Sequence, residues 1–402
     1  MEKELGQLQT PCYILEEAEY RKNLQTFRNS FQKAWGGKCL FGYSVKTNHL
    51  RWLLGIAREE GYLAEVVSPD EYACVRMQGV PDREIIYNGP QKGDTVLSAL
   101  RAGALVNLDS LQECELVAEA ARAGELEGPV APRIGLRVNF DLEARCPGET
   151  TCGPEVSRFG ICEENGDLER AVRLLRAAGL RVSGLHMHQS SGTRSLNIFR
   201  TLAEAAGEIA WKYDLADVDF VDLGGGFFGG SFFPGKPTVQ EYAQAVCAAL
   251  KKRFFPGRAA LVLEPGAGVL ATAMDYLTEV ISLREVRGKR IATLDGTMLH
   301  INPFMHPHPV PCELFFPGEK MTPGERESWI FAGSTCMEMD RIDPRDLDRR
   351  PRVGSRFLFR CCGAYMATHN SNFINAAPTI YARREGTFVL LREKDPRRMA
   401  EW

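Results

Sequence analysis

Three short stretches of the sequence carry residue types that could act together on one small molecule. Lys46 ends the apolar stretch GYSVKTN, and burial of an amine at the end of a strand lowers its pKa and favours Schiff-base chemistry. The Gly224 to Gly226 turn follows VDFVDL, and glycines let backbone N–H groups approach a phosphate closely. Glu264 ends the apolar stretch AALVLE, where an acid is costly unless a cation such as a protonated ring nitrogen pairs with it. Together these residues describe a site for pyridoxal phosphate (PLP).

The stretch GLHMHQSSGT, residues 184–193, adds two histidines one residue apart. His186 and His188 would project to the same side of a strand, so with a third ligand elsewhere they could bind zinc. A neutral imidazole packed flat on a pyridine ring also explains their position at the end of a strand, and Ser191 could then bond a phosphate. We favour stacking and expect no metal.

Eight β-rich apolar runs must position these residues. They lie at 38–45, 62–67, 83–88, 104–108, 132–139, 180–187, 218–223 and 259–264, and amphipathic helical patterns alternate with them. This alternation predicts an α/β fold, the (β/α)8 TIM barrel. Barrel enzymes place their chemistry at the carboxyl ends of the strands. Polar or glycine residues do end the runs: Lys46, Ser68, Asn88, Asp109, Arg137 with Asn139, His188, the glycine turn and Glu264.

A second domain follows the barrel. After Glu264 the alternation stops, and β-prone pieces such as DYLTEVISLREV, SRFLFRCCGAY and TFVLLRE are separated by Pro/Gly-rich turns. The opening TPCYIL is also strand-like and precedes a helix, so we expect it to pair with this later domain. The predicted organisation is a PLP-binding barrel over residues 20–272 and a mostly β C-terminal domain formed by residues 1–19 and 273–402.

Composition indicates the class of partner. The 402 residues carry a net charge of −3, with 44% hydrophobic and 25% charged residues. This composition lacks the excess of positive charge typical of nucleic-acid-binding proteins and favours small-molecule chemistry. A secretory signal and a bilayer-spanning apolar run are absent from the sequence, so we expect a cytoplasmic protein with no membrane partner. The twelve cysteines include no CxxC pair and are interpreted mainly as small buried hydrophobes.

Across essentially its whole length, the chain resembles the fold-type III PLP-dependent decarboxylases, which have an alanine-racemase-like barrel and include diaminopimelate, ornithine and arginine decarboxylases. The motifs are YSVKTN, EVVSPDE, GLHMHQSSG, DLGGGF, EPG, GSTCMEMD and GAY. The resemblance implies that Lys46 forms the Schiff base, His188 stacks on the ring and Glu264 contacts the pyridine nitrogen. The other expected cofactor contacts are Glu65 (where aspartate is usual), Arg137, Ser191, Gly224, Gly225, Gly226, Gly266 and Tyr365.

The same resemblance implies a homodimer with shared active sites. Cys336, in GSTCMEMD, would enter the partner's active site and help reprotonate the product; the alternative is an inert interface cysteine. SRFGI resembles the family's SKFG, which suggests that Arg158 pairs with Asp340 of the partner subunit. Gly363 of GAY is also expected at the interface.

The implied reaction is PLP-dependent decarboxylation of an α-amino acid through a Lys46 Schiff base and a quinonoid intermediate. Glu264 favours decarboxylation over racemisation, because alanine-racemase-like relatives use an arginine at the ring nitrogen. An amino-acid racemase stays an alternative. Ala267 stands where the family's EPGR arginine supports the phosphate, which leaves a catalytically inactive regulatory homologue as a further alternative.

The substrate is expected to be lysine-, ornithine- or diaminopimelate-like, or a modified or carrier-bound amino acid. Diaminopimelate decarboxylases bind the distal carboxylate with an arginine, yet no arginine lies between Arg290 and Arg326. Ornithine-type enzymes place aspartate where this chain has Met337. The remaining candidates for the substrate pocket are His300, His306, His308, Met337, Glu338 and Phe373.

Overall fold

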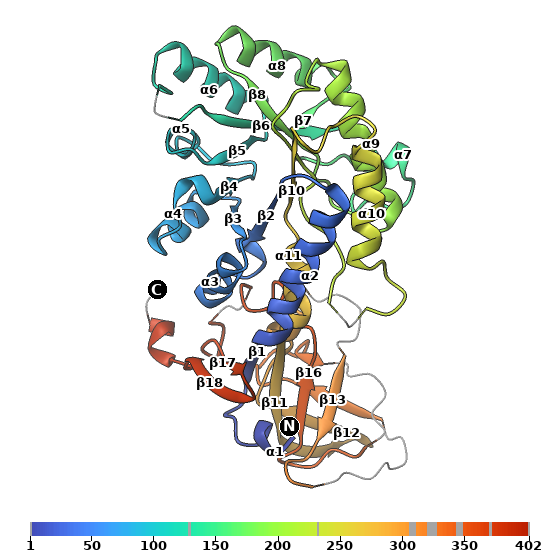
Figure 1. Ribbon diagram of the computed structural model, residues 1–402. Helices are drawn as coiled ribbons and strands as arrows, with labels where there is room; N and C mark the ends of the chain where they lie inside the picture. Colours follow the sequence, from blue (N-terminus) through green and yellow to red (C-terminus); the bar gives the residue numbers. More distant parts are fainter. Residues whose placement is uncertain are drawn as a thin grey trace. The chain divides into compact units, whose positions relative to one another are not determined.

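The computed structural model describes residues 2–127, 130–230, 233–304, 311–319, 328–342, 349–369 and 372–400. The chain divides into two compact units, traced in Figure 1. The barrel unit comprises residues 23–229 and 233–269, and the β unit comprises residues 1–22, 230–232 and 270–402. Two of the divisions fall inside helices α2 (Glu17–Trp35) and α11 (Gly266–Leu270), and the others flank residues 230–232.

Eight parallel strands close into a barrel in the order β5-β4-β3-β2-β10-β9-β8-β6, and pairing between β5 and β6 completes the ring. They are β2 (Cys39–Ser44), β3 (Leu63–Val66), β4 (Ile85–Tyr87), β5 (Leu105–Leu108), β6 (Arg133–Asn139), β8 (Val182–His186), β9 (Phe220–Asp222) and β10 (Ala260–Leu263). Each lies within one of the eight predicted runs, so the TIM-barrel prediction is confirmed. The short β7 (Ile161–Cys162) pairs with β6 and was not predicted.

Helices alternate with these strands. They are α3 (Arg51–Glu59), α4 (Pro69–Met77), α5 (Thr95–Arg101), α6 (Leu111–Arg122), α7 (Leu142–Arg145), α8 (Asp167–Ala177), α9 (Leu196–Lys212) and α10 (Val239–Leu250), with 3-10 turns η1 (Val45–Thr47) and η2 (Asp82–Glu84). Their starts follow local chemistry. The side chain of Ser68 caps α4 by accepting the N–H of Glu71, and Thr238 forms a capping box with Glu241 at the start of α10.

Small residues inside the barrel make room for two larger side chains. A Cβ atom added at Gly184 would lie 2.3 Å from the ring of Phe220, and one added at Gly135 would lie 1.9 Å from the amide oxygen of Asn107. Phe220 packs in an apolar cluster with Ile86, Leu105, Ala260 and Val262. Gly184 and Gly135 therefore leave space inside the barrel for the apolar cluster around Phe220 and for the amide of Asn107.

The β unit is a mixed sheet in the order β15-β14-β12-β11-β1-β17-β18, with β16 pairing to both β11 and β13. Its elements are α1 (Glu2–Leu5), β1 (Cys12–Glu16), η3 (Ala271–Ala273), β11 (Met274–Val286), β12 (Lys289–Leu294), α12 (Met298–Ile301), β13 (Cys312–Phe315), β14 (Trp329–Ala332), β15 (Arg341–Ile342), β16 (Arg356–Phe359), β17 (Thr379–Arg384), β18 (Thr387–Arg392) and η4 (Pro396–Ala400). β1 lies antiparallel to β11 and parallel to β17. The expected contribution of the N-terminal strand is confirmed.

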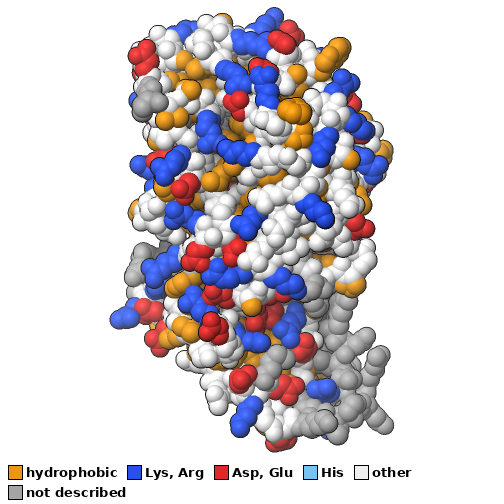
Figure 2. All heavy atoms as spheres, in the orientation of Figure 1, with side chains coloured by type: hydrophobic (Ala, Val, Ile, Leu, Met, Phe, Trp, Pro, Cys, Tyr) orange, Lys and Arg blue, Asp and Glu red, His pale blue; other side chains and the backbone are white. Residues whose placement is uncertain are grey.

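The surface is mixed in charge. On the face displayed in Figure 2, lysine and arginine side chains are interspersed with aspartate and glutamate, as the small net charge of −3 leads one to expect. Among the described helices, none combines the length and apolar content needed to cross a bilayer.

Candidate active site

Lys46 lies in η1, directly after β2, and is paired with a buried acid on the neighbouring strand. Its Nζ lies 2.6 Å from Oε2 of Glu65 and 2.8 Å from Oε1, and it donates to Oγ of Ser44 across 3.0 Å. Glu65 is fully buried, whereas the Lys46 side chain is 38% exposed. The β2–β3 register places Ser44 opposite Glu65. The ammonium is thus anchored at its base and accessible to a small molecule.

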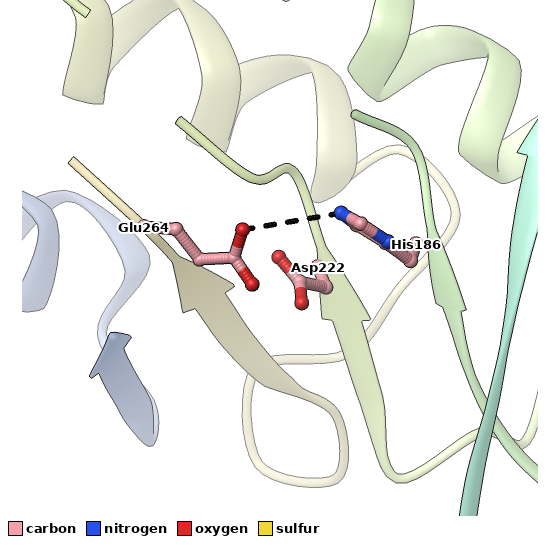
Figure 3. A group of neighbouring side chains, drawn as sticks. All are labelled: His186, Asp222 and Glu264. Carbon is pink, nitrogen blue, oxygen red and sulfur yellow. Dashed lines mark ion pairs between the residues drawn. The ribbon is translucent and has the colours of Figure 1, made fainter. Parts of the chain in front are cut away.

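Glu264 follows β10 and lies among buried acids. Asn88 donates to its Oε1 across 2.6 Å, and Nε2 of His186 lies 4.0 Å from its Oε2 (Figure 3). Burial, together with the negative charges of Asp222 and Glu65, raises the pKa of Glu264 well above its usual range. Burial also raises the pKa of Asp222 to about 6. This end of the site has an excess of acid and favours a cationic partner.

The trio of His186, Asp222 and Glu264 offers ligand atoms that all lie within 4.8 Å of one another. Over the described part of the chain, neither ring nitrogen of His186 has a hydrogen-bond partner, and burial holds its pKa well below the usual range, so the imidazole is neutral. A neutral imidazole and two carboxylates could hold a metal ion. A protonated ring nitrogen beside Glu264 would satisfy the same excess of negative charge.

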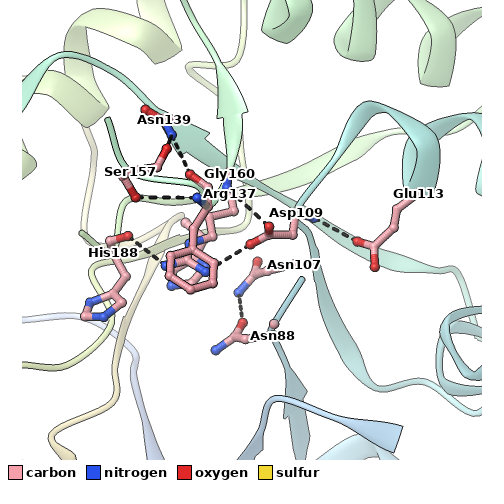
Figure 4. Close-up of polar contacts among 12 residues, drawn as sticks. Asn88, Asn107, Asp109, Glu113, Arg137, Asn139, Ser157, Gly160 and His188 are labelled. Atoms are coloured by element: carbon pink, nitrogen blue, oxygen red, sulfur yellow. Dashed lines mark hydrogen bonds and ion pairs between the residues drawn. The ribbon is translucent and has the colours of Figure 1, made fainter. Parts of the chain in front are cut away.

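Two buried amides link the acids, and Figure 4 shows the hydrogen bond between these amides, Asn88 and Asn107. Asn88 donates to Glu65 across 3.0 Å as well as to Glu264. Asn107 donates to the amide oxygen of Asn88 across 2.8 Å and to Oδ2 of Asp222 across 3.0 Å. Side chains in or directly after five different strands, β3, β4, β5, β9 and β10, therefore form one connected polar network.

The glycine turn after β9 packs directly against Glu264. The N–H of Glu264 donates to the carbonyl oxygen of Gly224 across 2.8 Å, and a Cβ at Gly225 would lie 2.2 Å from the carbonyl oxygen of Glu264. At Gly266, which has a φ of +28°, a Cβ would lie 2.9 Å from Oγ1 of Thr47. Three predicted segments, those of Lys46, Gly224 to Gly226 and Glu264, thus meet at one end of the barrel.

His188 lies over the same turn. A Cβ at Gly224 would come within 2.4 to 2.6 Å of Cβ, Cγ and Nδ1 of His188, so a residue without a side chain is required there. The His188 ring lies nearly parallel to that of His186, with an angle of 8° and centroids 6.1 Å apart. Burial, reinforced by the charge of Arg137, lowers the pKa of His188 to about 3. A neutral ring in this position suits stacking.

Arg137 supports this region. Its Nη1 lies 2.9 Å from Oδ1 of Asp109, and its Nη2 donates to the carbonyl oxygen of His188 across 3.3 Å. Asp109 also accepts the N–H of Gly160 (Figure 4). Arg137 therefore holds the segment that carries His188.

Ser191 has polar partners in a neighbouring loop. Its hydroxyl donates to the carbonyl oxygen of Glu149 across 3.1 Å and accepts the N–H of Arg194 across 2.8 Å. Glu149 also accepts a bond from Asn197. The predicted phosphate contact of Ser191 stays a prediction.

The β unit carries the remaining candidates. Cys336 is exposed, and the Glu338 side chain is 98% exposed. Tyr365 has a φ of +69°, a conformation that costs free energy for a non-glycine residue. Met337 is partly exposed and Phe373 is 46% exposed.

Two of the predicted interface residues, Gly363 and Asp340, have buried contacts within their own chain. A Cβ at Gly363 would lie 1.9 Å from the carbonyl oxygen of Leu270. The carboxylate of Asp340 accepts the N–H of Met298 across 2.8 Å and both the N–H and the hydroxyl of Thr335. Arg158, its expected partner in the other subunit, is exposed.

The predicted histidine-rich pocket is described only at His300. That side chain is 3% exposed, its Nδ1 lies 2.6 Å from the hydroxyl of Tyr276, and its carbonyl oxygen accepts the hydroxyl of Tyr13. These contacts give His300 a role in the interior of the β unit. His306 and His308 lie outside the described residues.

Sequence reasoning singled out Asn88 only as a strand end and did not identify Ser44, Asn107 or Asp222 as part of the site. A signal was present, because each is a polar residue inside an apolar strand: GYS, LVNL and VDFVDL. Alternation along a strand turns such a side chain toward the barrel interior.

A family model described as the pyridoxal-dependent decarboxylase, pyridoxal binding domain, matches residues 18–271. The chain is 29% identical over 302 residues to a diaminopimelate decarboxylase of Zymomonas mobilis, covering 73% of this chain and 69% of that one. It is 27% identical over 403 residues to a diaminopimelate decarboxylase of Methanothermobacter thermautotrophicus, with 96% and 89% coverage. A diaminopimelate decarboxylase structure from M. jannaschii shares the fold, with a TM-score of 0.83, 23% identity and 96% and 90% coverage.

The site fits the cofactor of this family. Lys46 is an accessible amine, the turn of Gly224 to Gly226 carries no side chains of its own, and the acids around Glu264 need a cation that a protonated pyridine nitrogen supplies. His188, Gly224 and Glu264 come from three neighbouring strands and meet at one barrel end. The chain belongs to the pyridoxal-dependent decarboxylases and is a PLP-dependent amino-acid decarboxylase.

Proposed function

We propose that this protein decarboxylates a free or conjugated α-amino acid in a site where Lys46 and Glu264 would hold PLP. The observation that carries the proposal is that the cation and the excess acids lie at different ends of the site. Lys46 already has a carboxylate partner in Glu65, whereas Glu264, beyond the Asn88 amide, is buried among acids. A cofactor with an aldehyde for the amine and a basic ring nitrogen for the acid joins these two ends.

Each residue has a distinct task in this proposal. Lys46 would supply the amine that holds the cofactor. Glu264 would keep a proton on the ring nitrogen, and the neutral His188 would pack against the ring. The cofactor supplies an electron sink for the pair left behind by the departing CO2.

The substrate side chain is the open part of the proposal. The relatives are named for diaminopimelate, but the sequence between Arg290 and Arg326 has no arginine for a distal carboxylate. We therefore infer a substrate whose distal group is read by other means, such as a modified amino acid or one carried by a partner protein.

Mass-spectrometric detection of CO2 tests the reaction directly. The panel contains lysine, ornithine, arginine, both diaminopimelate isomers and glutamate, each with added PLP, and chiral analysis of the recovered amino acid follows racemisation. Release of CO2 from one member supports decarboxylation and identifies the side-chain class. Inverted stereochemistry without CO2 would replace the proposal with a racemase. A visible cofactor band with neither product points to a conjugated substrate.

We also propose a homodimer in which Cys336 donates a proton in the partner's site. The exposure of Cys336 supports this role. Mixing Lys46→Ala and Cys336→Ala subunits tests it, because half of the mixed dimers' sites would be intact. Recovery of about a quarter of wild-type activity from two impaired variants is expected for random pairing. Activity equal to the sum of the separate variants would place both groups in one subunit's site.

A further inference from the structure

Asn88 occupies the point where the two ends of the site meet. It follows β4, is 3% exposed, and its backbone N–H donates to the carbonyl oxygen of Val66 across 2.8 Å. This bond ties Asn88 to the end of β3, the strand that carries Glu65. Its side chain is therefore delivered from a rigid part of the barrel.

The amide orientation has one solution. Its nitrogen donates to Oε1 of Glu65 across 3.0 Å and to Oε1 of Glu264 across 2.6 Å. Its oxygen accepts the amide N–H of Asn107 across 2.8 Å. Exchanging nitrogen and oxygen would turn a carbonyl oxygen toward the Lys46-paired carboxylate of Glu65 and would set the N–H groups of Asn88 and Asn107 against each other. Both amide hydrogens are thus committed to the two acids.

The Asn88 side chain links Glu65 and Glu264 without carrying a charge, and this neutrality matters as much as its geometry. Glu65 is paired with Lys46, while Glu264 lies beside the further acid Asp222. A lysine or arginine at position 88 would neutralise Glu264 and remove its need for a protonated ring nitrogen. An amide holds the carboxylate in place and leaves its charge available.

We propose that Asn88 is a positioning residue that couples the lysine end of the PLP site to its ring-nitrogen end. It sets the separation between Glu65 and Glu264, so that one cofactor can meet both. The inference rests on the cofactor assignment within the proposed function and extends it to a residue that touches neither the amine nor the reacting atoms.

PLP affinity of the cofactor-free protein tests the coupling. Asn88→Ala removes both donors. Asn88→Asp keeps the shape but adds a fourth carboxylate, and on protonation it regains one donor. Asn23→Ala is the matched control, because it removes a buried amide that donates to the carbonyl oxygen of Val269 across 3.1 Å. Each variant is titrated with PLP at pH 6, 7 and 8, and thermal unfolding is followed in parallel.

We expect Asn88→Ala to raise the Kd for PLP about tenfold or more at every pH, since hydrogen bonds to charged groups are the strong ones. Asn88→Asp should raise it about a hundredfold relative to wild type at pH 8, and only about tenfold at pH 6, where protonation restores a donor. Asn23→Ala should stay within about twofold of wild type even with an equal loss of Tm.

Wild-type affinity in Asn88→Ala would overturn the inference. A ratio of the Asn88→Asp Kd to the wild-type Kd that does not change with pH would also overturn it. If residue 88 acted only through packing, protonation of the new aspartate would not restore PLP binding. These measurements do not use CO2 release. Wild-type protein that binds PLP but releases no CO2 would remove the proposed reaction and leave the role of Asn88 standing; wild-type protein that binds no PLP would remove both.

Discussion

The backbone N–H of Glu264 donates to the carbonyl oxygen of Gly224 across 2.8 Å, so the turn after β9 and the acid after β10 are held against each other. Gly225 completes this contact, since its Cα faces the carbonyl oxygen of Glu264. The turn that is expected to bind the phosphate thus also supports Glu264, the acid expected at the ring nitrogen.

Gly225→Ala should displace Glu264, because the new Cβ would start 2.2 Å from its carbonyl oxygen. We expect the Kd for PLP to rise about tenfold to a hundredfold and the Tm to fall, as for other overpacked sites. Gly55→Ala is the control, because among the described residues no atom outside the backbone of α3 lies within 4 Å of a Cβ added there, and alanine should stabilise the helix. Unchanged PLP affinity in Gly225→Ala would contradict this close approach.

Borohydride reduction of the PLP-loaded protein should attach the cofactor to Lys46, and peptide mass spectrometry identifies the modified lysine. Lys92 provides an internal control, because it is fully buried between the carbonyl oxygen of Gly89 and the carboxylate of Glu113. Lys46→Ala should lose the label and lower CO2 release by about a thousandfold or more. Labelling of Lys92 in place of Lys46 would refute the assignment of the amine.

Glu264→Gln should stabilise the cofactor-free protein at high pH while weakening PLP binding. The raised pKa of Glu264 means that the folded state retains a proton that the unfolded state has released, so wild-type stability falls as pH rises above about 4.5. The free energy of unfolding of the variant, relative to that of wild type, should therefore increase by about 2 kcal/mol from pH 5 to pH 8. Urea unfolding at both pH values measures the gain, and a constant difference would show that Glu264 ionises normally.

The fold of this protein could be predicted from the sequence more completely than its site. The eight strand runs were predictable because a strand buried on both faces is a short apolar stretch, and the polar residue that ends it is visible in the sequence. Which polar residues meet was less visible. Glu65, Asn88 and Glu264 come together only through closure of the barrel, which sets β10 beside β2. His300 was interpreted as a pocket residue because nothing local shows its buried bond to Tyr276.

His300 should make the β unit sensitive to acid. Burial lowers its pKa to about 3, so the folded state stays neutral while the unfolded state takes up a proton below about pH 6.5. The contribution of this residue to stability should fall by about 1.4 kcal/mol per pH unit below that value. Urea unfolding at pH 6.5 and pH 5 measures this effect. From pH 6.5 to pH 5, the free energy of unfolding of His300→Gln should increase by about 2 kcal/mol relative to that of wild type.

Tyr276→Phe supplies the control for this measurement. It removes the partner of His300 but leaves a buried imidazole, so the acid sensitivity should persist. Equal pH dependence in His300→Gln and wild type would mean that the imidazole is protonated alike in the folded and unfolded states.

The position of β1 imposes an order on biosynthesis. β1 lies between β11 and β17, and its parallel partner, residues 379–383, is separated from it by more than three hundred residues of chain. During translation the barrel strands leave the ribosome long before that partner exists, and the first strand of the protein must wait through the synthesis of the whole barrel. A chain stopped before residue 379 leaves one edge of β1 unpaired, an exposed template for association with other chains.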